Sequence, residues 1–279
     1  MKKVQFHYPN PIHFDVDTMR DVEVYIDRIP RSIVEPNKIR IIILEEPRKG
    51  QVYRQVQHHP SWYSYVLTFH DELLRKEPRL QGKARRFLMM NTWVRDYVPK
   101  KKEFSVSTVV GGKSSPRVPG YEIRHELWRN RQSITIPRKF YLSGNAVNSH
   151  TFIPWTEVSY EGELVLGDSK KPLFDSMFHI AIESFQIKNY FSEKILDCFQ
   201  TKTIPVYCGC GNIGEFFNIK GILVCNTIKE IIDTCNGLTP EYYKRSKDAI
   251  EDNYNRAMKW LDPKQQVEDA VREILKEVR

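Results

Sequence analysis

NYFSEKILDCFQTKTIPVYCG, residues 189–209, predicts a helix that is followed directly by a buried strand. Ser192 begins a helix over 192–202, and the apolar run at 203–209 has the length and composition of a strand. Lys194 lies in the first turn of this helix, where the partial positive charge of the backbone favours anions. This lysine is easier to explain if an anion binds at the same place.

The alternation of strand and helix continues outward from this stretch along the whole chain. Short apolar runs in the first hundred residues have the character of strands: 22–26, 39–46, 63–69 and 85–91. In the second part, strands are expected at 104–110, 138–144, 177–184 and 221–227, and helices at 121–133 and 228–235. Strands and helices in alternation are typical of parallel sheets with crossover helices, so the expected fold class is α/β.

Two such blocks indicate two Rossmann-like domains with a cleft between them. We expect the first domain to cover 1–100 and the second to cover 101–261, with a separate C-terminal helix at 262–279. Asp262 and Pro263 are suited to the N-cap and first position of that helix. Its apolar residues recur at a spacing of three and four, so it must pack one face against another element.

The charge of the chain suits an anionic partner. Lys and Arg number 43 against 35 Asp and Glu, which makes a net charge of +8. The basic run at Lys100–Lys102 follows Pro99, and we interpret it as a solvated linker rather than a nucleic-acid patch. No nucleic-acid-binding pattern appears, so we expect no nucleic-acid partner, whereas peripheral contact with an anionic surface is compatible with the charge.

The sequence favours a cytoplasmic protein. No apolar run approaches the roughly 18–20 residues of a membrane span, and MKKVQFHYPNPIHF lacks the sustained apolar segment of a signal peptide. The five cysteines are an odd number, which indicates reduced thiols. The sequence makes no prediction of the oligomeric state.

Charged and polar side chains gather around the start of the 192–202 helix. Glu183 lies at the end of a predicted strand, and Tyr190, Glu193 and Lys194 follow it closely. Ligands of parallel α/β sheets bind beyond the carboxyl ends of the strands, and free N–H groups at a helix start bind phosphate oxygens. A nucleotide diphosphate suits this arrangement, although a Glu-Lys pair is also common in the first turn of an ordinary surface helix.

The longer stretch 177–218, MFHIAIESFQIKNYFSEKILDCFQTKTIPVYCGCGNIGEFFN, carries a specific motif. It resembles the donor-binding motif of glycosyltransferase family 10, the α-1,3/1,4-fucosyltransferases, and weaker similarity extends across most of the chain. The residues that fit the family pattern without a gap are Phe178, Glu183, Tyr190, Ser192, Glu193, Lys194, Ile204, Pro205, Val206 and Gly209.

This resemblance implies an inverting glycosyltransferase with a GT-B type fold. The domain at 1–100 would bind a glycan acceptor, and the domain at 101–261 would bind a nucleotide sugar, with GDP-fucose as the default donor. No metal ion is needed if the cationic side chains do the work that a divalent ion does elsewhere, and we expect no cofactor beyond this co-substrate. Ser184 stands where the family usually has asparagine, and a hydroxyl lacks the paired donor and acceptor of an amide. Another donor such as UDP-xylose therefore stays open.

The resemblance also implies roles for single residues. Arg124 is the best match to an arginine beside the diphosphate, and Arg117 is the reserve candidate. Glu45 matches the general base because it stands two residues before Pro47, and Glu46 is its alternative. The residues that would shape the donor site are Glu183, Ser184, Tyr190, Glu193 and Lys194.

Two rival functions and two weaker motifs complete the sequence hypotheses. The rivals are an exostosin-like glycosyltransferase with a UDP-linked donor and a non-catalytic glycan- or nucleic-acid-binding protein. Asp15 and Asp17 form a D-x-D triplet, but it does not follow a core strand, so we expect no metal site there. GGKSS at 111–115 resembles a phosphate loop but lacks its first glycine, since position 107 is serine.

Overall fold

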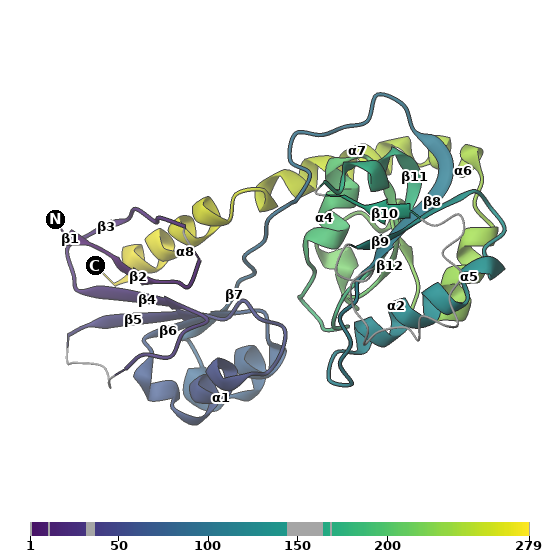
Figure 1. Ribbon diagram of the computed structural model, residues 1–279. Helices are drawn as coiled ribbons and strands as arrows, with labels where there is room; N and C mark the ends of the chain where they lie inside the picture. Colours follow the sequence, from purple (N-terminus) through teal and green to yellow (C-terminus); the bar gives the residue numbers. More distant parts are fainter. Residues whose placement is uncertain (1, 11, 32–36, 144–163, 168, 279) are drawn as a thin grey trace. The chain divides into compact units, whose positions relative to one another are not determined.

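The computed structural model describes residues 2–10, 12–31, 37–143, 164–167 and 169–278, which fold into two compact units (Figure 1). Unit 1 comprises Met1–Met90, Lys188–Tyr190 and Asp262–Arg279, and unit 2 comprises Asn91–Ile187 and Phe191–Leu261. The chain thus enters unit 2 before residue 100. The C-terminal helix belongs to unit 1.

Unit 1 is built on a five-stranded sheet in the order β2-β4-β5-β6-β7, in which every pair of neighbours is parallel. The strands are β2 (Gln5–His7), β4 (Val22–Ile26), β5 (Ile39–Ile43), β6 (Tyr65–Thr68) and β7 (Ala84–Arg86). Shorter elements are the antiparallel pair β1 (Lys2–Lys3) and β3 (Asp17–Thr18), and helical turns at Pro60–Trp62, Glu72–Lys76 and Pro78–Leu80. The run expected as a strand at 85–91 contributes only its first residues to β7.

Helices cover both faces of this sheet, which is why β4 and β5 are buried along their whole length. Successive side chains of a strand point to opposite faces. Ile41 and Ile43 pack in a layer with helix α8 (Pro263–Glu277), and Ile42 packs in the opposite layer with helix α1 (Gln51–His58). The continuous apolar run in the sequence therefore supplies both layers of the core.

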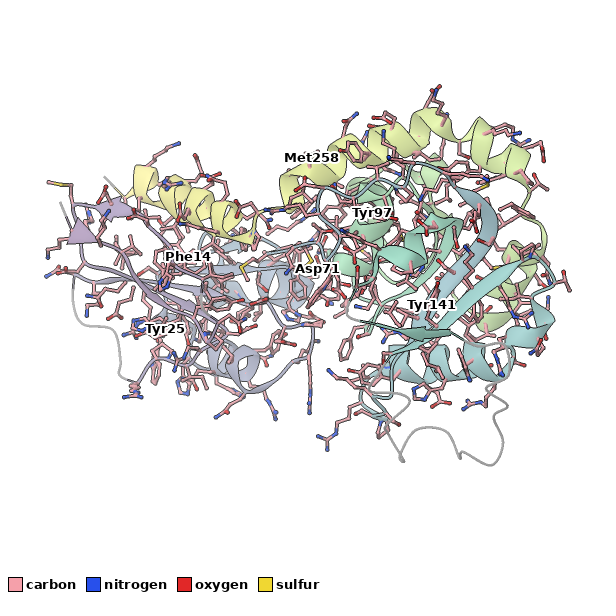
Figure 2. All side chains as sticks on the ribbon, turned by 45° about the horizontal axis from the view of Figure 1, so that its top comes forward. Phe14, Tyr25, Asp71, Tyr97, Tyr141 and Met258 are labelled. Carbon is pink, nitrogen blue, oxygen red and sulfur yellow. The ribbon has the colours of Figure 1, made fainter. Side chains whose placement is uncertain are left out.

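Helix α8 begins as its sequence predicts. The Asp262 side chain accepts a hydrogen bond from the backbone N–H of Gln265 at 3.1 Å. Its buried aliphatic residues lie on the sheet of unit 1: Val267, Val271 and Ile274. Phe14 belongs to this layer and Tyr25 to the layer on the α1 side (Figure 2).

Unit 2 is built on a six-stranded parallel sheet in the order β10-β9-β8-β11-β12-β13. Its strands are β8 (Glu103–Val110), β9 (Arg138–Ser143), β10 (Leu164–Leu166), β11 (Ser176–Ile182), β12 (Ile204–Cys208) and β13 (Leu223–Val224). Its helices are α2 (Pro119–Arg129), α4 (Glu193–Gln200), α5 (Ile228–Asn236), α6 (Pro240–Arg245) and α7 (Lys247–Ala257). Short helical turns lie at Arg131–Ser133, Lys171–Asp175, Ile213–Glu215, Ile219–Gly221 and Met258–Trp260. Helices α2 and α5 cover one face of the sheet and α4 and α7 the other (Figure 1).

The stretch at 189–209 forms the expected helix and strand. Ser192 is the N-cap of α4, and its hydroxyl accepts a hydrogen bond from the backbone N–H of Lys194 at 3.4 Å. β12 follows at once and is buried throughout. Within the described residues, no helix combines the length and apolarity that crossing a bilayer requires.

Lys102 corrects the interpretation of the basic run as a solvated linker. Lys100 and Lys101 are exposed, but the Lys102 ammonium group turns inward and donates hydrogen bonds to the Phe174 carbonyl and the Thr203 hydroxyl. Burial lowers the pKa of Lys102 to about 7. The sequence could not show this because both acceptors are distant along the chain.

Candidate functional site

A cavity of about 450 Å³ in unit 2 gathers several of the residues that the sequence singles out. Its walls include the ends of β8 and β11 and the first turn of α4, so it lies where parallel sheets bind ligands. Four cationic side chains line it: Lys113, Arg124, Lys170 and Lys194. Glu193 also lines the cavity, which therefore carries a net positive charge and suits a polyanion.

Lys194 is held at the start of α4 by oxygen atoms of its own segment. Its ammonium group lies 3.0 Å from the Ser192 hydroxyl, 3.0 Å from a Glu193 carboxylate oxygen and 3.7 Å from a Glu183 oxygen. The side chain is 26% exposed, so it can face a ligand in the cavity while these contacts orient it.

Glu183 is buried beneath the start of α4. Its two carboxylate oxygens accept hydrogen bonds from the backbone N–H and the hydroxyl of Ser192, at 2.8 and 2.6 Å. A Cβ atom on Gly209 would lie 2.5 Å from the Glu183 side chain, so this glycine leaves the room that the carboxylate occupies. Glu183 therefore fixes the first turn of α4, and its side chain is closed to solvent.

Arg124 lies where helix α2 meets the end of β11. Its guanidinium donates to the Ile182 carbonyl at 2.6 and 3.1 Å and to the Ser184 hydroxyl at 3.3 Å. Arg117, the reserve candidate, is exposed, lies before α2 and is not among the residues that line the cavity. Ser184 thus contacts Arg124, which lines the cavity, without being a lining residue itself.

Gly120 makes the position of Arg124 possible, although no sequence motif singles out this glycine. Its backbone N–H donates to the Ser184 carbonyl at 3.1 Å. A Cβ atom at this position would lie only 1.9 Å from the Glu183 carbonyl oxygen. The glycine therefore lets α2 begin directly against the end of β11, one turn before Arg124.

Glu193 is an ionised acid among the cavity cations. Burial by itself would raise the pKa of its carboxyl, but Lys194 and Lys170 outweigh this and hold the pKa at about 2. Lys170 was missed by sequence reasoning because it lies in no motif. Its ammonium is 3.8 Å from Glu193, 3.7 Å from Asp197 and 5.2 Å from the centre of the exposed Trp93 ring.

The expected base lies in unit 1, at the carboxyl end of β5. Glu45 is half-buried and accepts a hydrogen bond from the Tyr8 hydroxyl at 3.1 Å, whereas Glu46 is exposed. Burial, with the nearby acids Asp27 and Glu46, raises the pKa of Glu45 to about 7. A carboxylate of this pKa can accept a proton near neutral pH.

Asp27 shapes the turn that carries Glu45. One of its carboxylate oxygens accepts the backbone N–H groups of Glu45 and Glu46, at 3.1 and 2.8 Å. Asp27 has a φ of 44°, in the left-handed region that aspartate tolerates better than most residues. Burial raises the pKa of Asp27 to about 6. The sequence signal was only an aspartate directly after a buried strand.

Tyr190 is not among the residues that line the cavity of unit 2. It is buried in unit 1, where its ring centre is 5.0 Å from that of Phe69. The structure thus brings Arg124, Glu193 and Lys194 to one cavity, and it groups Tyr190 with the other unit.

The D-x-D aspartates are held by a lysine. The Lys3 ammonium forms ion pairs with Asp15 at 2.5 Å and with Asp17 at 2.9 Å. In the part of the chain that the structure describes, no group of three histidine, cysteine, aspartate or glutamate side chains is arranged to hold a metal ion.

Comparison with known proteins adds the fold family. No protein-family model matches the chain, and neither does any curated protein. The crystal structure of an α1,3-fucosyltransferase matches with a TM-score of 0.55 and 16% identity, over 96% of this chain and 80% of that one. A complex of α1,3-fucosyltransferase with GDP-fucose matches with a TM-score of 0.52 and 17% identity, over 95% and 79%. The pneumococcal O-GlcNAc transferase GtfA, in complex with UDP and GlcNAc, matches with a TM-score of 0.56 and 10% identity, over 92% and 57%.

The chain has a GT-B fold. This confirms the expected α/β class and the two domains with parallel sheets. At these identities the likeness concerns the fold alone, because one fold serves many functions. In this GT-B chain, the groups suited to chemistry are the cations of the unit 2 cavity and the carboxyl of Glu45 in unit 1.

Proposed function

We propose that this chain is an inverting glycosyltransferase that moves a sugar from a nucleotide sugar onto a hydroxyl of a glycan acceptor. The observation that carries the proposal is the cavity of unit 2, where Arg124, Lys170 and Lys194 meet the start of α4. Cations and the free N–H groups of a helix start are the groups that bind a diphosphate. The GT-B fold supports this assignment because the named neighbours are glycosyltransferases.

In the proposed reaction, Glu45 takes the proton of the acceptor hydroxyl as its oxygen attacks the anomeric carbon. The bond between that carbon and the diphosphate oxygen breaks, and its electron pair leaves with the diphosphate. Arg124 and Lys194 neutralise the charge that develops on this leaving group. These cations do the work that a divalent ion does elsewhere, so we propose a reaction without metal.

GDP-fucose is the proposed donor. The motif at 177–218 supports it, and so does the fold match to an α1,3-fucosyltransferase crystallised with GDP-fucose. Position 184, where the family usually has asparagine, is a serine that is hydrogen-bonded to Arg124. Because of this difference, UDP-xylose stays the alternative donor. The rival of another class is a non-catalytic binding protein that has the same fold.

Thermal unfolding with GDP, UDP and single-stranded RNA separates these functions. A ligand at 100 times its dissociation constant stabilises the folded state by about 2.7 kcal/mol. We expect GDP to raise the melting temperature, and GDP-fucose to be transferred or hydrolysed in a panel of nucleotide sugars. Stabilisation by UDP alone would assign another donor, and a response to RNA without any turnover would overturn the enzyme proposal.

A further inference from the structure

A short chain of hydrogen bonds ends on Glu45. Tyr8 follows β2, and its hydroxyl oxygen lies 3.1 Å from one Glu45 carboxylate oxygen and 3.4 Å from the other. The amide nitrogen of Asn10 lies 2.9 Å from the same hydroxyl oxygen. The three side chains therefore form a line from Asn10 through Tyr8 to Glu45, within unit 1.

The direction of these bonds follows from what each group can donate. A phenol has one O–H donor and two acceptor lone pairs, and an amide NH₂ group can only donate. Asn10 occupies a lone pair of the Tyr8 oxygen, which leaves the phenol hydrogen for the Glu45 carboxylate. Burial raises the pKa of Tyr8 to about 12, so the hydroxyl keeps its proton at any pH where the protein works.

The other groups that face Glu45 act in the opposite sense. Asp27 approaches from the end of β4, Glu46 from the same turn, and both are acids that disfavour a second negative charge. Burial also disfavours the carboxylate. Among the described neighbours that act on this carboxyl, Tyr8 favours the ionised form, because a hydrogen bond to a carboxylate stabilises its charge.

We infer that Tyr8, oriented by Asn10, is a positioning residue that favours the ionised form of Glu45 and directs its carboxylate for proton abstraction. This inference rests on the proposed function, in which Glu45 must be a carboxylate before the acceptor hydroxyl loses its proton. The Tyr8 hydroxyl can donate one hydrogen bond to the carboxylate, whose two oxygens have further lone pairs for the acceptor. The nearest sequence signal was a tyrosine ahead of Pro9 and Asn10.

Tyr8→Phe tests the inference because it removes the hydroxyl and keeps the ring beside Phe14. Loss of the hydrogen bond raises the pKa of Glu45, so the acidic limb of kcat/KM against pH moves to higher pH, by about one unit. At pH 6 the rate falls about tenfold below the parent, and well above the limb it returns toward the parent value. Tyr25→Phe is the matched control, since its hydroxyl contacts Glu23 instead, and its profile stays unchanged.

A second measurement does not depend on activity. The carboxyl of Glu45 is titrated by ¹³C NMR in the full chain and assigned through its absence in Glu45→Gln. We expect the titration midpoint of Glu45 to rise in Tyr8→Phe and to rise by less in Asn10→Ala. The second variant keeps the tyrosine, so it tests the inference even if Tyr8→Phe folds poorly. The inference is overturned if the midpoint is unchanged in both variants, or if the rate falls equally at every pH. In that case Glu45 stays the proposed base as long as Glu45→Gln is inactive. A fully active Glu45→Gln overturns the base itself.

Discussion

The residues around α4 show how a buried acid can support a site whose cavity it does not line. Glu183 binds the N–H and hydroxyl of Ser192, and Ser192 in turn contacts the ammonium of Lys194. Buried polar groups are costly unless they are hydrogen-bonded, and here every oxygen of the Glu183 carboxylate has a partner. Part of the motif that resembles a donor site, Glu183 and Ser192, thus serves to orient Lys194.

Lys194→Ala is expected to weaken nucleotide-sugar binding and slow turnover, since the diphosphate needs its charge both when bound and when leaving. A lost charge-assisted contact is worth about 1.5–3 kcal/mol, or roughly a tenfold to hundredfold rise in Kd. Calorimetry with GDP measures the binding. Lys194→Gln brings no rescue because it carries no charge.

Lys202→Ala is the control for this variant. Lys202 lies in the same unit and pairs with Glu251 on an exposed surface, so its removal is expected to leave GDP affinity unchanged. If Lys194→Ala binds and turns over like the parent protein, the interpretation of the α4 start as a diphosphate site is wrong.

Glu45→Gln separates catalysis from donor binding. The amide keeps the size of the side chain but cannot accept a proton, and removal of a general base costs about 10²–10⁴-fold in rate. We expect kcat to fall by this factor, with donor affinity within a few-fold of the parent. Because the pKa of Glu45 is raised to about 7, parent activity falls as the pH drops through 7 and the carboxyl is protonated.

Glu46→Gln is the internal control, and it is expected to keep most activity, with an acidic limb at slightly lower pH because the Glu46 charge that raises the pKa of Glu45 is lost. An essential Glu46 beside a dispensable Glu45 would move the base by one residue. Full activity of both variants would remove the base from this turn.

At the scale of elements, the donor-site geometry depends on how closely α2 approaches β11. Only a glycine permits the start of α2 to lie against the Glu183 carbonyl, and Arg124 is placed one turn further along. The guanidinium is then held by the Ile182 carbonyl at the end of the strand. A helix, a strand end and one glycine thus act together to orient a cation.

Gly120→Ala is expected to push α2 away from β11. The added Cβ would meet a backbone oxygen at 1.9 Å, which cannot move as a flexible side chain can. Overpacking of this kind costs about 1–3 kcal/mol of folding free energy, measurable by urea unfolding, and GDP affinity is expected to fall with it. Gly214→Ala is the control because a Cβ atom added there would meet no described atom within 4 Å, and equal stability of both variants would contradict the close approach.

At the scale of the whole molecule, part of the excess positive charge is concentrated at the cavity of unit 2. The chain carries a net charge of +8, and four of its cations line the cavity of unit 2. A cluster of this kind raises the local concentration of an anionic substrate and is screened by salt.

Activity is expected to survive EDTA, because we assign the charge of the diphosphate to Arg124 and Lys194. Turnover of the nucleotide sugar is measured before and after chelation, and again after addition of manganese. Loss of activity with EDTA and recovery with manganese would contradict the assignment. It would favour a metal site at Asp15 and Asp17, which form ion pairs with Lys3 in the structure.

Much of the fold was predictable from local patterns in the sequence. The cap at Ser192, the cap at Asp262 and the apolar runs of β4, β5 and β12 all form the elements that their residues indicate. Caps and periodicity depend on neighbours within one or two turns, so a single sequence contains the information. The α/β class follows from the order of these elements.

Only the tertiary structure decided which side chains share a site. Lys170 joins Glu193, Tyr8 reaches Glu45, and the Lys102 ammonium turns into unit 2 to meet Thr203. These partners are separated by 23 to 101 positions along the chain. Such pairs depend on the order of strands in a sheet and on how closely a helix approaches it. The local periodicity of a sequence predicts neither of these. The sequence by itself thus determined the elements and the α4 motif, and long-range packing determined the chemistry around them.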